Sequence, residues 1–223
     1  MLFFDIDATL LDHERAEEKG SIEFLKENKE ELKLSTTEFV KRWYELSDKY
    51  YTKFLSKELS FQEQRRMRMK ALFGSHLNND QADNKFNTYL KFYKSNWRAF
   101  DDVIPCLEIL KKQGNRLGVI SNGDYKQQIE KLESINISKY FDCVVTSSEI
   151  GVAKPNATIF LKACDKADVP IHESYYIGDR LKTDAIGSKH AGMKGIWINR
   201  KDKTSHPDVI VIHSLSELAV LNN

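Results

Sequence analysis

The sequence predicts an α/β fold, in which a Rossmann-like parallel sheet carries helices on both faces and a separate subdomain is entirely helical. Three observations predict it. Short apolar runs alternate with helical patterns beyond residue 101, which is typical of βαβ units. A long helical stretch follows the first apolar run, and polar clusters directly follow several of the runs. The predicted division is an α/β core of residues 1–14 and 100–223 and a helical subdomain of residues 15–99.

The first element is an apolar run, residues 2–4, that Asp5 stops at once, so it predicts a short buried strand. Apolar residues then recur at helical spacing from position 21 to about position 100. Residues 60–63 (Ser-Phe-Gln-Glu) have the form of a capping box, which predicts a helix that starts there. Gly74 is the expected stop of that helix.

Strands and helices alternate in the rest of the chain. Each apolar run is followed by turn-forming or polar residues and then by a helical pattern. The strands are predicted at residues 116–120, 143–146, 174–177, 194–198 and 209–212, and the helices at 103–113, 126–135, 157–167, 184–192 and 214–221. In a parallel sheet of this kind, ligands bind at the carboxyl ends of the strands.

Composition narrows the classes of function. The 223 residues include 34 basic and 33 acidic side chains, a formal net charge of +1, which gives no reason to expect a nucleic-acid polymer or a membrane as partner. No apolar stretch approaches the length of a membrane span, and no signal peptide is recognisable. The three cysteines, Cys106, Cys143 and Cys164, form no disulfide or zinc pattern. A cytoplasmic location is expected.

Two carboxylates follow the first predicted strand. Asp5 and Asp7 are two residues apart on an extended chain, so their side chains point the same way. One can attack as a nucleophile while the other serves as acid and base. As isolated residues they would equally suit the turn after a strand.

Three further clusters are expected at the same edge of the sheet. Residues 121–124 (Ser-Asn-Gly-Asp) offer a hydroxyl and backbone amides to a phosphate oxygen. Lys154 offers an ammonium that would neutralise a transferring phosphoryl group. Residues 178–184 carry Asp179 and Asp184, whose carboxylates are the hard oxygen ligands that Mg²⁺ prefers. A carboxylate nucleophile needs such a cation, because a phosphate dianion repels it.

In these four motifs and their order, the chain resembles the haloacid dehalogenase superfamily. The resemblance implies that Asp5 is the nucleophile, Asp7 the general acid/base and Lys154 a further catalytic group. The implied phosphate-binding residues are Thr9, Ser121, Asn122 and Lys154, and the implied Mg²⁺ ligands are Asp5, Asp7 (through its backbone carbonyl), Asp179 and Asp184. Asp184 would act through a metal-bound water or by orienting Lys154. The helical subdomain looks like the family's cap, which closes over the site and selects the substrate. Ala8 departs from the family, which usually has Gly or Asp there.

The reaction expected is hydrolysis of a small phosphorylated metabolite. Expelling a halide needs no proton, so an acid at Asp7 favours a phosphatase over a dehalogenase. Residues 119–123 and 151–156 look similar to nucleoside-monophosphate phosphatases, so a 5′-nucleotide is one candidate substrate. A sugar-phosphate mutase keeps the same acid and stays open, as do a phosphate-accepting signalling domain and a non-catalytic binding protein. The sequence does not indicate the oligomeric state.

Overall fold

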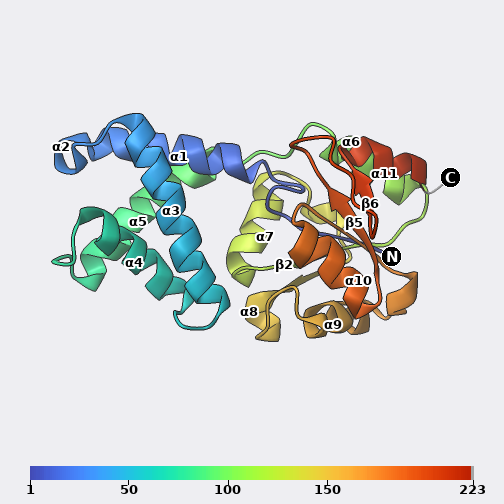
Figure 1. The fold of residues 1–223 in the computed structure, drawn as a ribbon. Coiled ribbons are helices and arrows are strands. Elements are labelled where there is room, and N and C mark those ends of the chain that lie inside the picture. Colours follow the sequence, from blue (N-terminus) through green and yellow to red (C-terminus); the bar gives the residue numbers. More distant parts are fainter. Residues whose placement is uncertain (222–223) are drawn as a thin grey trace. The chain divides into compact units, whose positions relative to one another are not determined.

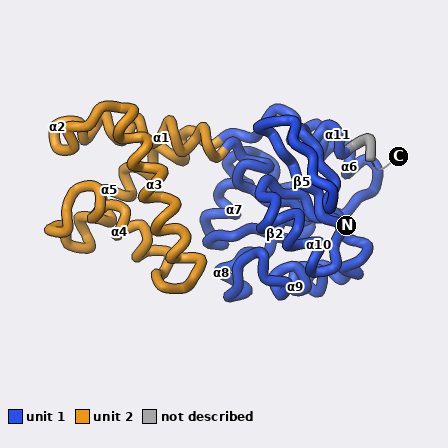
Figure 2. The backbone as a smooth tube through the Cα atoms, in the orientation of Figure 1, with its two compact units in different colours: residues 1–12, 98–223 blue, residues 13–97 orange. Residues whose placement is uncertain are grey.

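The computed structural model describes residues 1–221 (Figure 1). Residues 222 and 223, which the predicted core includes, lie outside this description. The chain forms two compact units, one of residues 1–12 and 98–223 and the other of residues 13–97 (Figure 2). No helix among residues 1–221 is both long and apolar enough to cross a lipid bilayer.

The first unit is built on a six-stranded sheet in which every neighbouring pair is parallel. The strand order is β3-β2-β1-β4-β5-β6. The strands are β1 (Leu2–Phe4), β2 (Leu117–Ser121), β3 (Cys143–Thr146), β4 (Tyr175–Gly178), β5 (Lys194–Ile198) and β6 (Ile210–Ile212). The order runs outward in both directions from β1, so the sheet has its topological switch point there. The predicted fold class is confirmed.

Helices lie between the strands of this sheet along the chain, and one helix follows the last strand. They are α6 (Val103–Lys112), α7 (Tyr125–Ser134), α8 (Ser147–Ile150), α9 (Ala157–Ala167), α10 (Gly187–Ala191) and α11 (Leu215–Leu221). α6 contacts α11 and α9 contacts α10, and the two pairs lie on opposite sides of the sheet (Figure 1). Under α9, the Phe160 ring packs edge-on against Tyr176 of β4 with 5.2 Å between centroids. Buried apolar contacts of this kind stabilise the unit by removing surface from water.

One helix of the core differs from the prediction. The segment expected to begin at residue 184 begins at Leu181 as a π-helix, Leu181–Ile186, and α10 continues it. Single π turns inside helices are often found at functional sites. The short helix α8 has no counterpart among the predicted elements.

The second unit contains helices alone among its regular elements. They are α1 (His13–Glu27), α2 (Lys29–Leu32), α3 (Thr36–Leu55), α4 (Phe61–Phe73) and α5 (Asn79–Ser95). The capping box predicted at residues 60–63 is confirmed, and Gly74 is the C-cap of α4. Ser35 and Asn78 cap α3 and α5 in the same way. These caps satisfy amides that the first turn of a helix leaves unpaired.

Aromatic side chains from four helices fill the helical unit. Trp43 of α3 packs against Phe24 of α1 and Tyr89 of α5, with 4.2 Å between the Trp43 and Tyr89 ring centroids. Arg68 of α4 lies over the Trp43 ring at 4.7 Å. Many of the apolar residues that recur at helical spacing in this unit therefore form its core, and several of these buried side chains are aromatic.

Candidate active site

The predicted polar clusters lie after the carboxyl ends of three central strands. Asp5 follows β1, Asn122 follows β2, and Asp179 follows β4. The backbone amide of Asp5 donates to the Ile177 carbonyl of β4, which ties the first cluster to the fourth. The clusters meet because these strands are neighbours around the switch point of the sheet.

Lys154 lies at the centre of this group, in the loop between α8 and α9. Its ammonium Nζ is 2.9 Å from Asp5 Oδ1 and 2.9 Å from Asp184 Oδ1. It also donates to the Tyr176 hydroxyl at 2.5 Å, and that hydroxyl donates to the Ile120 carbonyl. The ammonium thus contacts two carboxylates and one hydroxyl. Burial alone would lower the pKa of Lys154, but the charges of Asp184 and Asp5 raise it.

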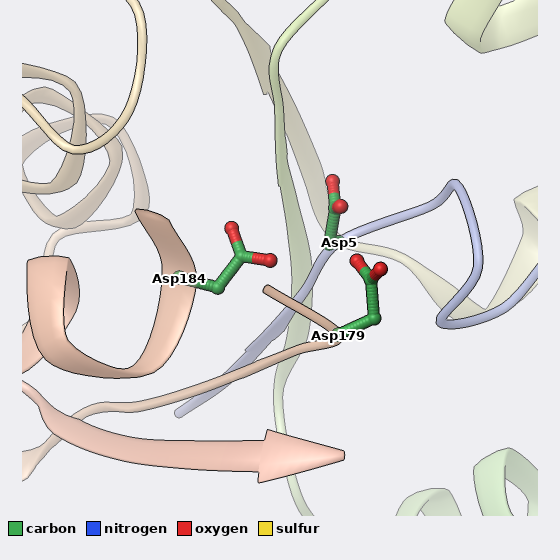
Figure 3. Close-up of side chains that lie close together, drawn as sticks. All are labelled: Asp5, Asp179 and Asp184. Atoms are coloured by element: carbon green, nitrogen blue, oxygen red, sulfur yellow. The ribbon is translucent and has the colours of Figure 1, made fainter. Parts of the chain in front are cut away.

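Three carboxylates converge beside this lysine. Carboxylate oxygens of Asp5, Asp179 and Asp184 lie within 4.8 Å of one another, and Figure 3 shows them on three separate segments facing a common space. Burial and the neighbouring charges of Asp5 and Asp184 raise the pKa of Asp179 to about 7. Burial also raises the pKa of Asp5, against the opposing effect of Lys154. One ammonium does not balance these carboxylates, so the group has the charge and the oxygen donors that suit a divalent cation.

The π-helical segment explains how Asp184 reaches the group. The backbone amide of Arg180 donates to Asp184 Oδ2 at 3.0 Å, which folds the segment back over the end of β4. Gly178 is needed at this turn, because a Cβ there would lie 2.5 Å from the Asp184 side chain. Asp184 Oδ2 is thus engaged by this amide, whereas Oδ1 lies 2.9 Å from the Lys154 ammonium and accepts no hydrogen bond from a described residue. Oδ1 of Asp184 therefore belongs both to the ion pair with Lys154 and to the three-carboxylate group.

Asp7 lies outside the three-carboxylate group. Its carboxylate is bound by Lys131 Nζ at 2.7 Å from each oxygen, and Gln128 Nε2 donates to Oδ2 at 3.3 Å. Gln128 Nε2 also donates to Ser121 Oγ at 2.7 Å. Sequence reasoning missed Lys131 and Gln128. The signal that could have found them is their spacing of three on one face of a helix, beside the buried Leu132.

The predicted phosphate-binding residues occupy different surroundings. Asn122 is bound to the backbone of Lys154 in both directions, at 3.0 Å and 2.7 Å, so its amide positions that lysine. Ser121 is almost fully buried and accepts from Gln128. Thr9 is fully buried, and among the described residues its hydroxyl has no hydrogen-bond partner. The structure therefore links Ser121 to Asp7 through Gln128 and links Asn122 to Lys154, whereas the Thr9 hydroxyl is linked to none of these residues.

The loop that carries Asp7 is a tight turn. The Ile6 carbonyl accepts from the amides of Thr9, Leu10 and Leu11, and the Ala8 amide donates to the Leu11 carbonyl. Ala8 has a φ of 60°, in the left-handed region. This conformation suits glycine and strains a residue with a Cβ. The backbone therefore accommodates alanine at this position, where the family usually has Gly or Asp, in a locally strained conformation.

Known proteins share both the sequence and the fold. The model of the family described as "Haloacid dehalogenase-like hydrolase" matches residues 2–198. N-acylneuraminate-9-phosphatase of Mus musculus is 31% identical over 99% of this chain and 92% of its own length. Glyceraldehyde 3-phosphate phosphatase of Methanopyrus kandleri is 42% identical over 53% of this chain. That match spans about half (47%) of the archaeal protein.

A solved structure supports the same assignment. The HAD phosphatase from Thermococcus onnurineus superposes with a TM-score of 0.73 at 26% sequence identity, and the match covers 100% of this chain and 97% of that one. The family match extends over most of the chain, and the mouse relative covers nearly all of it. The predicted superfamily and the expectation of a hydrolase are thus confirmed, and the chain belongs to the haloacid dehalogenase-like hydrolase family.

Proposed function

We propose that the protein is a magnesium-dependent phosphomonoesterase that acts on a small phosphorylated metabolite through an aspartyl phosphate on Asp5. The observation that carries this proposal is the buried Asp5 carboxylate, held 2.9 Å from Lys154 and grouped with Asp179 and Asp184. In water a carboxylate is a poor nucleophile toward a phosphate dianion. In this site positive charge offsets the repulsion between the two anions.

The proposed first step transfers the phosphoryl group to the protein. Asp5 attacks phosphorus through a carboxylate oxygen, the phosphorus–oxygen bond to the alcohol breaks, and the leaving oxygen takes a proton from Asp7. Lys154 holds Asp5 in place and stabilises charge on the phosphoryl oxygens. In the second step Asp7 takes a proton from water, the water oxygen attacks phosphorus, and the Asp5 carboxylate leaves as inorganic phosphate is released.

The proposed metal ligands are Asp5, Asp179 and the backbone carbonyl of Asp7, with Asp184 acting through water or Lys154. The three carboxylates that lie within 4.8 Å fit a hard cation with oxygen ligands. Bound Mg²⁺ would supply the charge that lets two anions approach each other. Asp7 is also the residue that favours phosphoryl transfer over dehalogenation, because departure of a halide needs no proton.

For the substrate we favour a phosphorylated sugar or sugar acid. Support comes from the names of the relatives, which are glyceraldehyde 3-phosphate phosphatase and N-acylneuraminate-9-phosphatase. The nucleoside 5′-monophosphate expected from residues 119–123 and 151–156 stays a prediction that rests on those motifs alone. Residues 13–97 are the proposed cap, which would select among such substrates.

The test is phosphate release from a panel of sugar phosphates, nucleoside monophosphates and simple alkyl phosphates, with and without Mg²⁺. Wild type is expected to turn over at least one ester only with Mg²⁺, and Asp5→Asn to turn over none. Asp124→Asn is the matched control, because Asp124 caps α7 and asparagine is an equally good N-cap. No release from any ester by wild type would overturn the proposal, and halide release from 2-haloacids would then be measured.

A further inference from the structure

We propose that Lys131 is a positioning residue that holds the carboxyl group of Asp7 in the orientation needed to protonate the leaving alcohol. The inference deepens the proposed function and rests on it. Lys131 lies on α7, far from Asp7 in the sequence, and belongs to none of the four motifs.

The contact is short and two-sided. Lys131 Nζ lies 2.7 Å from Asp7 Oδ1 and 2.7 Å from Oδ2. The Lys131 side chain is 5% exposed, whereas that of Asp7 is 27% exposed. A buried ammonium is costly unless an anion pairs with it. The lysine is thus fixed inside the protein, and the carboxylate that it holds is the more exposed of the two groups.

Two lysines are buried among the described residues, Lys154 and Lys131, and each pairs with a different aspartate of the proposed mechanism. Lys154 pairs with Asp5, the proposed nucleophile, and Lys131 pairs with Asp7, the proposed acid and base. Each contact also leads to a second group of the site. Lys154 contacts Asp184, while Gln128, one turn before Lys131, joins Asp7 to Ser121.

The two carboxylate oxygens of Asp7 accept different numbers of hydrogen bonds. Oδ2 accepts from both Lys131 and Gln128, and Oδ1 accepts from Lys131. A carboxyl group that carries a proton on one oxygen keeps acceptor capacity on the other. Lys131 and Gln128 can therefore hold the group through Oδ2 while Oδ1 faces the leaving oxygen with the proton. Fixing such a group within hydrogen-bond reach is what makes acid catalysis effective.

The test compares esters that need the acid with esters that do not. Departure of an alkoxide needs a proton, whereas 4-nitrophenolate leaves without one. We would measure kcat/KM for glycerol phosphate, aryl phosphates of graded leaving ability and 4-nitrophenyl phosphate, in wild type and Lys131→Met. Because kcat/KM covers the steps up to departure of the alcohol, later hydrolysis of the aspartyl phosphate does not enter.

Lys131→Met is expected to lower kcat/KM for glycerol phosphate about 100-fold and for 4-nitrophenyl phosphate no more than about threefold. The ratio of the two is independent of the fraction of folded enzyme, so a partly misfolded preparation still gives a valid result. Lys126→Met, the same substitution at an exposed position of α7, is the control and should leave the ratio as in wild type.

An equal loss for both esters, or no loss for either, would overturn the positioning role of Lys131. Failure of the proposed function looks different, because wild type would then release phosphate from neither ester. That result would remove the role of Lys131 together with the phosphatase proposal.

Discussion

The two units of the protein bury carboxylates with opposite consequences. In the α/β unit, burial together with Asp5 and Asp184 raises the pKa of Asp179 to about 7. In the helical unit, Glu17 is buried more completely than Asp179, and burial alone would raise its pKa. The hydrogen bond and charge of His13, the charge of Arg68 and the hydrogen bond of Ser47 outweigh burial and lower that pKa to about 2.

The difference lies in the balance of charge around each group. The Glu17 carboxylate accepts hydrogen bonds from Trp43 Nε1 at 3.2 Å and from Ser47 Oγ at 2.9 Å. It also forms an ion pair with Arg68 at 3.6 Å. In the α/β unit, Asp5 and Asp184 share the ammonium of Lys154, and Asp179 lies in the same group of carboxylates. A buried carboxylate that has hydrogen-bond donors and a cation as partners stabilises a fold. A cluster of carboxylates with more negative than positive charge instead suits the binding of a cation. The pKa is thus shifted in opposite directions at the ion-paired Glu17 and at the proposed cation site.

The largest expected effect is that of Asp179→Asn. It removes one carboxylate from the cluster, so Mg²⁺-dependent phosphate release should fall at least about 1000-fold. Without metal the same change should raise the free energy of unfolding, on the order of 2 kcal/mol, because it relieves repulsion between buried charges. Kinetics and urea denaturation without metal would measure the two effects. A variant that is less stable than wild type in the absence of metal would contradict the assignment.

Glu17→Gln should have the opposite effect on stability. It leaves Arg68 in the aromatic core without its anion, which should lower the free energy of unfolding by about 3 kcal/mol. Tryptophan fluorescence follows this well, because Trp43 packs beside the pair. Asp48→Asn, at a position of α3 outside this network, serves as control. Unchanged stability in Glu17→Gln would show that the buried pair is not structural.

The pH dependence of stability should differ between the two units. The folded pKa of Glu17, about 2, lies below the ordinary 4.5, so its contribution is present above pH 4.5 and is lost as the pH falls toward 2. The folded pKa of Asp179, about 7, lies above the ordinary 3.8, so its contribution is present below pH 3.8 and is lost as the pH rises through 7.

Metal-free protein should therefore be most stable near pH 4 to 5, with a decline on the alkaline side that Mg²⁺ reverses. Unfolding midpoints recorded across this range, with Mg²⁺ and with a chelator, would show it. Identical curves with and without metal would be inconsistent with a cation site at Asp179.

The smallest expected effect concerns backbone strain. Ala8→Gly should raise the free energy of unfolding by about 0.5 kcal/mol, because glycine adopts its left-handed conformation without a Cβ clash. Lys33→Gly is the matched change in the helical unit, since Lys33 is the left-handed C-cap of α2. Both should gain similar stability, and only Ala8→Gly should alter kcat, because Ala8 adjoins Asp7. A loss of stability in Ala8→Gly would contradict the strain.

Much of the fold follows from local patterns. The predicted helix at residues 157–167 and the predicted strands at residues 143–146 and 194–198 have the same bounds as α9, β3 and β5, because apolar periodicity and turn residues delimit them. The early start at Leu181 was missed, since the π turn depends on Asp184 folding back onto the Arg180 amide. Such a contact is tertiary and leaves no periodic signal.

In the site, too, local patterns predicted some residues, whereas others depend on tertiary contacts. The motif residues Asp5, Lys154, Asp179 and Asp184 were predicted from strand ends, and the structure brings these four together. Lys131 and Gln128 were missed because their side chains are ordinary for a solvated helix face. Their role depends on which face of α7 packs against the loop after β1. The amide of Asn122, predicted for phosphate, is occupied by the Lys154 backbone, which only the fold reveals.

The most direct test of the contrast between the two units is a measurement of Mg²⁺ binding. Isothermal titration calorimetry and the unfolding temperature would measure it in wild type, Asp179→Asn and Glu17→Gln. The account predicts that Mg²⁺ binds and stabilises wild type and Glu17→Gln, and that it leaves Asp179→Asn unchanged. Equal binding by wild type and Asp179→Asn, or no binding by wild type, would contradict the claim that the raised pKa of Asp179 marks a cation site.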